Sequence, residues 1–362
     1  MTIYIFELLL VWVMGMLLYM KKINKKTFIV VVFFVLAMVL GLRGESVGED
    51  TGHFIDVFNY AQNVSWKTAF TSGFDVVYTI IYSADQSIEV GYLILNKLVG
   101  IFTDNAQWLI FIVAVATCWL FGKFIYDNFE KVFLPTYVFM CESLYMNSFN
   151  LMRQILAIAI ALQAFKMIKE GKYKKAVIVI LVAFLFHKTA ILLLALIPLY
   201  LWKNKKRATK FVFIGAVAIT AGLQVIAVII SALIPRYANY FTTNYWDTEV
   251  GITAVMWLIE IVLCLFFYFY RGFKKNDNED FIPVSCTILY LACEIISFRV
   301  SIFSRIAMVF SPFLMQLFVR GKTLFGKKTR LVYLVGLMAV LTVIFLLYAK
   351  ADSRVYYFFW QG

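Results

Sequence analysis

The chain has 362 residues, of which 63% are apolar and only 15% charged. One soluble core cannot bury that much apolar surface, so the composition excludes an ordinary soluble domain and predicts an all-α, polytopic transmembrane helical bundle. The net charge of +13 comes from short Lys and Arg clusters between apolar runs, a pattern typical of cytoplasmic loops that argues against nucleic-acid binding.

The first apolar run is followed by lysines and lacks a small-residue cleavage site, so we expect a retained anchor rather than a signal peptide. At about 20 apolar residues per crossing, the predicted spans lie near 3–20, 27–42, 106–122, 132–147, 150–168, 211–234, 251–270, 281–297, 303–319 and 331–349. With two further segments this predicts about 10–13 membrane segments, in a single integral-membrane domain over 1–362. The basic clusters between the spans place the N-terminus outside, and the aromatic run 356–360 is expected at the outer interface.

Residues 43–105 are predicted to form an external loop region. A crossing by its apolar segment 90–102 would conflict with the charge topology, because 27–42 exits outward and 106–122 must start outside. We therefore expect an interfacial helix near 90–102 that lies on the membrane.

Residues 176–202 have lysines on both flanks, so both ends are expected at the cytoplasmic face. One helix of this length would be about 40 Å long, which exceeds a hydrocarbon core of about 30 Å and conflicts with the charges. A re-entrant hairpin that turns at 186–189 satisfies both constraints. Such a turn must line a protein-enclosed cavity, because lipid cannot satisfy its backbone polar groups.

This topology brings basic residues of distant segments to the outer face. They are Arg43, Arg153, Lys188 and Arg305. Charge near hydrocarbon is costly unless it is paired or hydrated, so these residues are candidates for binding a diphosphate. Two alternatives stay open: Arg43 and Arg153 can snorkel to lipid phosphates, and an internal Glu294–Arg299 pair can account for the charge near Arg305.

Two residues are the main candidates for a proton acceptor. His187 can take a proton near neutral pH, although a lone histidine is as often a hydrogen-bonded structural residue. Asp50, in the Gly-rich run 41–53, can act as a base, bind sugar hydroxyls or pair with Arg43. His53 is expected to be a loop residue, with catalysis as the less favoured role. Two histidines and five cysteines without CxxC spacing predict no metal site.

Glu89, Tyr92 and Asn96 recur at three- to four-residue spacing on one face of a helix. Carboxylate, aromatic and amide groups together suit a glycan, although the same pattern describes an ordinary amphipathic helix. The other candidates for glycan binding are Gln154, beside Arg153, and Thr51.

Five segments carry unusual residue patterns: LRGESVGEDTGHF at 42–54, EVGYLILNKLV at 89–99, NLMRQILAIAI at 150–160, FHKTAIL at 186–192 and FSRIAMVF at 303–310. In order and spacing they resemble the EpsG family of Wzy-like, O-antigen-type exopolysaccharide polymerases over nearly the whole chain. The chain departs from that pattern at 52–54, where such proteins often carry a tyrosine.

The resemblance implies a multi-pass glycosyltransferase of the bacterial cytoplasmic membrane that joins repeat units carried on polyprenyl diphosphate at the outer face. It implies no metal and no organic cofactor. Arg43, Arg153 and Arg305 would hold the diphosphate, while His187 or Asp50 would take the acceptor proton. A flippase and a chain-length regulator are candidate partners. Two other functions stay open, a lipid-linked oligosaccharide flippase and a membrane acyltransferase that modifies the polysaccharide.

Overall fold

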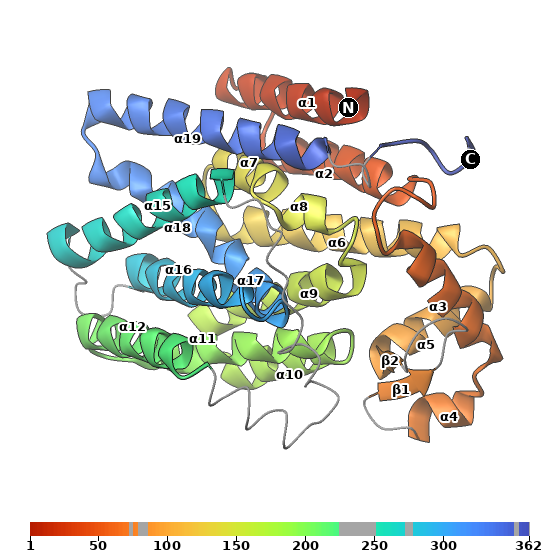
Figure 1. Cartoon of the computed structure of the whole chain (residues 1–362). Coiled ribbons are helices and arrows are strands. Elements are labelled where there is room, and N and C mark those ends of the chain that lie inside the picture. The colour runs from red at the N-terminus through yellow and green to blue at the C-terminus, as the bar shows by residue number, and fades with distance from the viewer. Residues whose placement is uncertain (72–74, 79–85, 224–250, 272–277, 351–354, 362) are drawn as a thin grey trace. The chain divides into compact units, whose positions relative to one another are not determined.

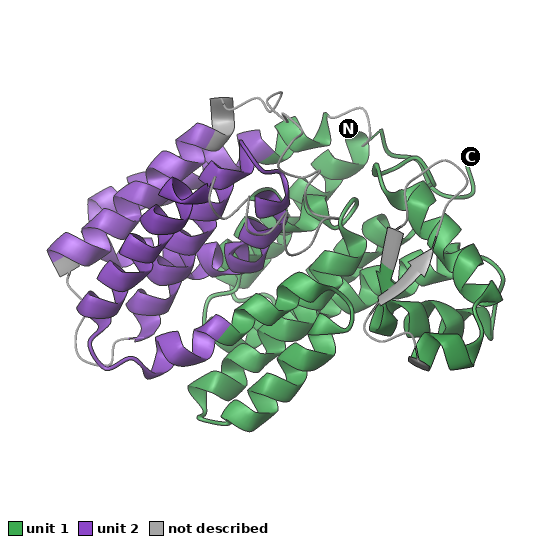
Figure 2. Cartoon of the chain, turned by 60° about the horizontal axis from the view of Figure 1, so that its bottom comes forward, with its two compact units in different colours: residues 1–194, 345–362 green, residues 195–344 purple. Residues whose placement is uncertain are grey.

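The computed structural model describes residues 1–71, 75–78, 86–223, 251–271, 278–350 and 355–361. These residues are almost entirely helical, with a single described β-hairpin (Figure 1), which confirms the predicted all-α class. The chain divides into two compact units, residues 1–194 with 345–362 and residues 195–344 (Figure 2). The prediction of a single integral-membrane domain is untested by this division and stays a prediction.

The first unit contains most of the N-terminal half of the chain. Its elements are α1 (Thr2–Tyr19), α2 (Lys25–Gly41), α3 (Thr51–Asn63), α4 (Trp66–Thr71), β1 (Asp75–Tyr78), β2 (Gln86–Glu89), α5 (Val90–Gly100), α6 (Gln107–Asn128), α7 (Phe133–Cys141), α8 (Leu144–Asn147), α9 (Met152–Lys169) and α10 (Tyr173–Phe184), followed by most of the 3-10 helix η1 (Lys188–Ala195). Helix α6 packs against both α2 and α9, and α9 packs against α10. Gly122 permits close packing of α6 on α2, because a Cβ there would lie 3.0 Å from the ring of Phe33.

The second unit is helical throughout its described residues. Its elements are α11 (Leu196–Leu201), α12 (Lys205–Ala221), α15 (Gly251–Phe266), the π-helix η3 (Phe267–Arg271), α16 (Asn278–Ser297), α17 (Ile302–Phe310), η4 (Ser311–Phe313), α18 (Leu314–Gly321), η5 (Lys322–Leu324) and most of α19 (Lys327–Ala349). The side chain of Asn204 caps α12 by accepting from the amide of Arg207 at 2.9 Å. At the start of α16, Asp280 accepts from Arg320 at 2.6 Å.

Within the described residues each predicted span overlaps a helix, although the helices differ in length. Five helical segments among the described residues are long and apolar enough to cross a membrane: Thr2–Tyr19, Gln107–Asn128, Asn278–Ser297, Ile302–Leu324 and Lys327–Ala349. The predicted span 132–147 is broken at 142–143 into α7 and α8. The predicted span 211–234 coincides with α12 as far as Ala221, and its second half lies outside the described residues.

The region 43–105 has elements and a core of its own. Helices α3 and α5 pack together around Phe54, Phe58 and Tyr92, and β2 pairs antiparallel with β1 and leads directly into α5. The ammonium of Lys97 donates to the carbonyls of Val64 and Ala61 at 2.6 and 3.1 Å, which neutralises the negative end of α3. Helix α5 occupies the predicted interfacial segment; its position at the membrane surface stays a prediction.

The predicted hairpin 176–202 contains the expected break. Helix α10 ends at Phe184, the chain turns at 185–187, and it continues as η1 and α11. The observed turn therefore begins at residue 185, one residue before the predicted turn at 186–189. That the two legs re-enter the membrane stays a prediction.

Candidate functional site

Among the described residues, Arg43 has the largest fully buried side chain, with 0% of its surface exposed. Its guanidinium donates to the carbonyls of Leu40 and Phe149 and, at 3.3 Å, to the hydroxyl of Thr51. It also lies 5.4 Å from the centre of the Phe149 ring. Arg43 thus joins the end of α2, the start of α3 and the turn between α8 and α9. Its contact with diphosphate stays a prediction, since the observed contacts are all internal.

The loop between α2 and α3, residues 42–50, is here called the mouth loop. It is fixed from within by Thr51, whose hydroxyl donates to the carbonyl of Val47 at 2.7 Å. Gly48 has a φ of +97°, and a Cβ there would lie 2.5 Å from the carbonyl oxygen of Phe149. Only glycine accommodates both the left-handed backbone and this close approach. The sequence-predicted glycan role of Thr51 stays a prediction, because the side chain is buried in these contacts.

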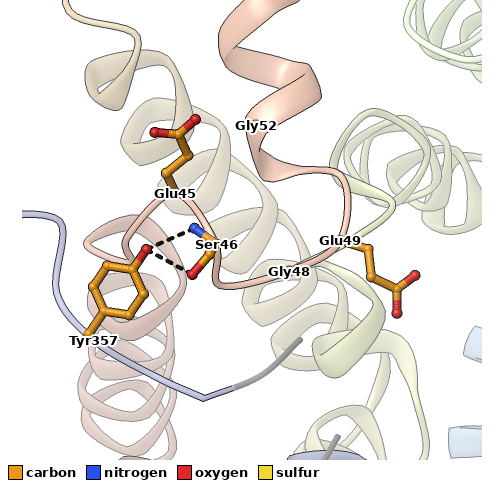
Figure 3. A pocket seen from close by; sticks show the side chains of 6 residues that line it. All are labelled: Glu45, Ser46, Gly48, Glu49, Gly52 and Tyr357. Atoms are coloured by element: carbon orange, nitrogen blue, oxygen red, sulfur yellow. Dashed lines mark hydrogen bonds between the residues drawn. The ribbon is translucent and has the colours of Figure 1, made fainter. Parts of the chain in front are cut away.

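The C-terminal segment 355–361 pairs with the mouth loop. Arg43 and Phe358 form an antiparallel bridge, in which the amide of Gly44 donates to the Tyr357 carbonyl at 2.9 Å. The Tyr357 hydroxyl also lies 2.9 Å from both the amide and the hydroxyl of Ser46 (Figure 3). This pairing was not predicted, because backbone hydrogen bonds between residues more than 300 apart leave no local pattern in the sequence.

A hollow of about 440 Å³ opens between the mouth loop, α3 and the C-terminal segment. It is lined by Glu45, Ser46, Gly48, Glu49, Gly52 and Tyr357 (Figure 3). The two carboxylates are exposed, Gly52 is half-buried and Gly48 is buried. Carboxylates beside an aromatic ring are chemically suited to sugar hydroxyls and to the apolar face of a sugar ring.

Arg153 forms the principal ion pair of the first unit. Its Nη1 lies 2.8 Å from Oε2 of Glu89, and the two side chains are 19% and 10% exposed. The guanidinium also lies 5.6 Å from the ring centre of Tyr92, which packs edge-on against Phe54. Three predicted site residues, from β2, α5 and α9, therefore meet. Because both side chains are largely buried, solvent screens this pair less than it screens an ordinary surface ion pair.

His53 lies in the first turn of α3 and is half-buried. Burial lowers the pKa of its imidazole, and the positive charge of Arg153 lowers the pKa further, against the opposite effect of Asp50 and Asp56. The ring is therefore neutral at neutral pH and able to accept a proton. The sequence ranked this residue below His187, because nothing local linked α3 to Arg153.

His187 is half-buried at the turn after α10. Its Nδ1 lies 2.8 Å from the hydroxyl of Thr189, which orients the ring. The turn is attached to α5, because the amide of Gly91 donates to the carbonyl of Leu185 at 2.8 Å. A Cβ at Gly91 would lie 2.7 Å from that oxygen, so glycine is needed here too. This contact links the His187 turn to the segment that carries Glu89.

Two predicted glycan-binding residues lie inside the protein. The Asn96 amide donates to the carbonyl of Tyr92 at 2.7 Å, and Gln62 donates to the Asn96 carbonyl at 3.2 Å. Gln154, on α9, is 2% exposed. Their positions favour roles in packing, and a glycan contact by either residue stays a prediction.

The remaining predicted diphosphate residues belong to different units. Lys188 is half-buried at the start of η1, in the first unit, whereas Arg305 is exposed on α17, in the second. The predicted meeting of Arg305 with Arg43 and Arg153 stays a prediction. Within the described residues, no group of three His, Cys, Asp or Glu side chains is placed to hold a metal ion.

The family model described as "EpsG family" matches residues 26–361, which is nearly the whole chain and both compact units. No curated protein and no solved structure matches the chain significantly.

Proposed function

Because the chain belongs to the EpsG family, a Wzy-like polymerase family, we propose that it polymerises polyprenyl-diphosphate-linked oligosaccharide repeat units into exopolysaccharide at the outer face of the cytoplasmic membrane. The family and the five apolar helices support a multi-pass membrane protein with a general role in polysaccharide polymerisation. The donor, the leaflet and the residue roles given below belong to the proposal.

The observation that carries the proposal is the position of Arg153, a partly exposed guanidinium that is held by Glu89 and Tyr92 and whose positive charge acts on His53. A guanidinium provides several donors in a planar fork that matches phosphate oxygens. Glu89 holds Nη1 at 2.8 Å and so fixes the orientation of the group before substrate binds. A positioned cation that acts electrostatically on a neutral imidazole suits a transfer with an anionic leaving group and a hydroxyl acceptor.

In the proposed reaction, an acceptor hydroxyl oxygen forms a bond to the anomeric carbon of the donor sugar. The bond from that carbon to the diphosphate oxygen breaks, and the electron pair leaves with the polyprenyl diphosphate. Arg153 stabilises the negative charge that grows on this leaving group, and it does so more strongly in the transition state than in the ground state. Lys188, which also belongs to the first unit, is a further cation for the diphosphate, and the predicted contribution of Arg305 stays a prediction.

The acceptor hydroxyl gives its proton to a base of the first unit. His53 is the base favoured by the structure, because the charge of Arg153 and partial burial keep it neutral. His187 and Asp50 are the other candidates. Arg43 supports the site by holding the mouth loop, and the hollow beside Tyr357 accepts sugar hydroxyls of the acceptor. Correct positioning of donor and acceptor supplies much of the remaining rate.

Complementation of a deletion strain tests the proposal and separates it from its alternatives. Arg153→Ala should abolish long polymer, and unpolymerised lipid-linked units should accumulate on the outer leaflet. Arg330→Ala, an exposed arginine of the second unit, is the matched control and should restore normal polymer. Accumulation on the inner leaflet would instead indicate a flippase. Polymer of normal length that lacks acyl groups would indicate an acyltransferase.

A further inference from the structure

The second unit contains an apolar groove of about 890 Å³ that runs along α12, α15 and α16 and continues onto η3. Helix α16 packs against both α12 and α15. Its side of the groove is formed by residues such as Val284, Ile288 and Ile295, whose spacing places them on one helical face. Polar side chains are few along the groove, and most of those present lie near one end.

The groove is basic at that end. Lys210 lines it directly, and the ammonium of Lys206 lies 5.5 Å from the ring centre of Tyr268, another lining residue. Lys206 and Lys210 are exposed. The first turns of α12 and α16 lie together at this end, because Lys205 lies 5.1 Å from the ring of Phe281. The far end, which the same helices reach at Ala221 and Ile295, is apolar.

The length of the groove matches one leaflet. From Thr209 to Ala221 helix α12 rises about 18 Å at 1.5 Å per residue, and half of a hydrocarbon core of about 30 Å is about 15 Å. The lysines belong to the cluster 203–210, which the positive-inside rule places at the cytoplasmic face. A lipid seated here therefore belongs to the inner leaflet, away from the proposed outer-face reaction.

We propose that this groove binds an anionic phospholipid of the inner leaflet, with its headgroup phosphate between Lys206 and Lys210 and one acyl chain along α16. Charge complementarity selects the occupant, because two ammonium groups at the headgroup end favour a net negative lipid over a zwitterionic one. The lipid site shares no residue with the proposed polymerisation site. The proposal therefore goes beyond that function and can be tested independently of it.

Lipid retention by the purified full-length protein tests the charge at the groove end. The protein is exchanged from detergent into equimolar phosphatidylglycerol and phosphatidylcholine with identical acyl chains, and bound lipids are counted by native mass spectrometry. Wild type should prefer phosphatidylglycerol by about tenfold, and Lys206→Gln with Lys210→Gln should reduce this preference to below about twofold. Lys174→Gln with Lys175→Gln removes two exposed lysines of α10 and should leave the preference unchanged.

A second variant tests the chain-binding part. Ala292→Phe introduces a ring at a lining position and should abolish retention of both lipids at this site. Equal retention of the two lipids by wild type, or equal loss in both lysine pairs, would overturn the proposal. Unchanged lipid retention in Ala292→Phe would also overturn the proposal. So would a wild-type protein that is dimeric while Ala292→Phe is monomeric, because the groove would then be occupied by a second copy of the chain. The lysine variants alter only exposed residues, so their comparison stands even where Ala292→Phe fails to fold.

Discussion

The guanidinium of Arg153 donates to the carboxylate of Glu89 at 2.8 Å, across 64 residues of the chain. This ion pair joins the start of α9 to the end of β2, and Tyr92 supports it from α5. A cation held in this way is already oriented for an anionic ligand, which removes part of the entropic cost of binding one.

Removal of the Glu89 carboxylate should reduce polymerisation without removing the cation. We expect Glu89→Gln to lower the polymerisation rate by about tenfold to a hundredfold, because Arg153 loses its oriented partner. Rates measured on lipid-linked repeat units at matched protein levels check this. Glu170→Gln breaks an exposed pair with Lys172 and is the control that should change nothing. A rate equal to wild type in Glu89→Gln would separate this ion pair from function.

His53 should titrate below the ordinary histidine pKa. The chain has two histidines, so His187→Gln leaves His53 as the only imidazole for ¹³C-histidine NMR. Its pKa should be lower than 6.5 and should rise in Arg153→Gln, because the second largest cause of the lowered pKa is then removed. A pKa unaffected by Arg153→Gln would show that the two residues do not interact.

The lowered pKa of His53 also makes the stability of the fold depend on pH. The unfolded chain binds a proton at His53 at higher pH than the folded chain does, so the unfolded state is favoured as pH falls. This contribution to stability is present above pH 6.5 and is lost as pH falls through the lower, folded pKa. The difference in melting temperature between wild type and His53→Gln should therefore be constant above neutral pH and should change in acid, where wild type loses more stability.

Arg43 should be required for the fold of the mouth loop. Lysine cannot reach the Thr51 hydroxyl and the Phe149 carbonyl together, so Arg43→Lys should lower the free energy of unfolding by about 2 kcal/mol or more. Thermal melting in detergent measures this, with Arg330→Lys as the exposed control. Normal melting combined with lost polymerisation in Arg43→Lys would contradict the structural role and support the predicted diphosphate contact.

The C-terminal segment should protect the mouth loop from opening. Tyr357→Phe removes the hydroxyl that bonds Ser46 and should cost about 1 kcal/mol. Amide hydrogen exchange in residues 42–52 should be faster in this variant, whereas Tyr270→Phe, an exposed tyrosine of the second unit, should leave it unchanged. Unchanged exchange in Tyr357→Phe would mean that the loop is held without this contact.

The sequence predicted the helical parts well because hydropathy over about 20 residues is a local property. It predicted the break near His187 from lysines on both flanks of 176–202, and α5 from an apolar segment whose crossing would conflict with the charge topology. It did not predict the folded core of 43–105, because Phe54 and Phe58 of that core lie in mixed polar sequence without a long apolar run.

The site was less predictable for a different reason. A guanidinium has the same donors whether it binds phosphate or internal carbonyls, so the sequence could not separate the buried Arg43 from the partly exposed Arg153. The link between His53 and Arg153 and the pairing of Tyr357 with Ser46 both depend on contacts between distant parts of the chain. Such contacts have no periodic signal in one sequence.

The most direct measurement is polymer formation by the purified protein in lipid nanodiscs, supplied only with a defined polyprenyl-diphosphate repeat unit. Wild type and Arg330→Ala should form a ladder of products, while Arg153→Ala should reduce the rate by about a hundredfold to a thousandfold in a protein that still melts cooperatively. A ladder of normal rate from well-folded Arg153→Ala would contradict the account.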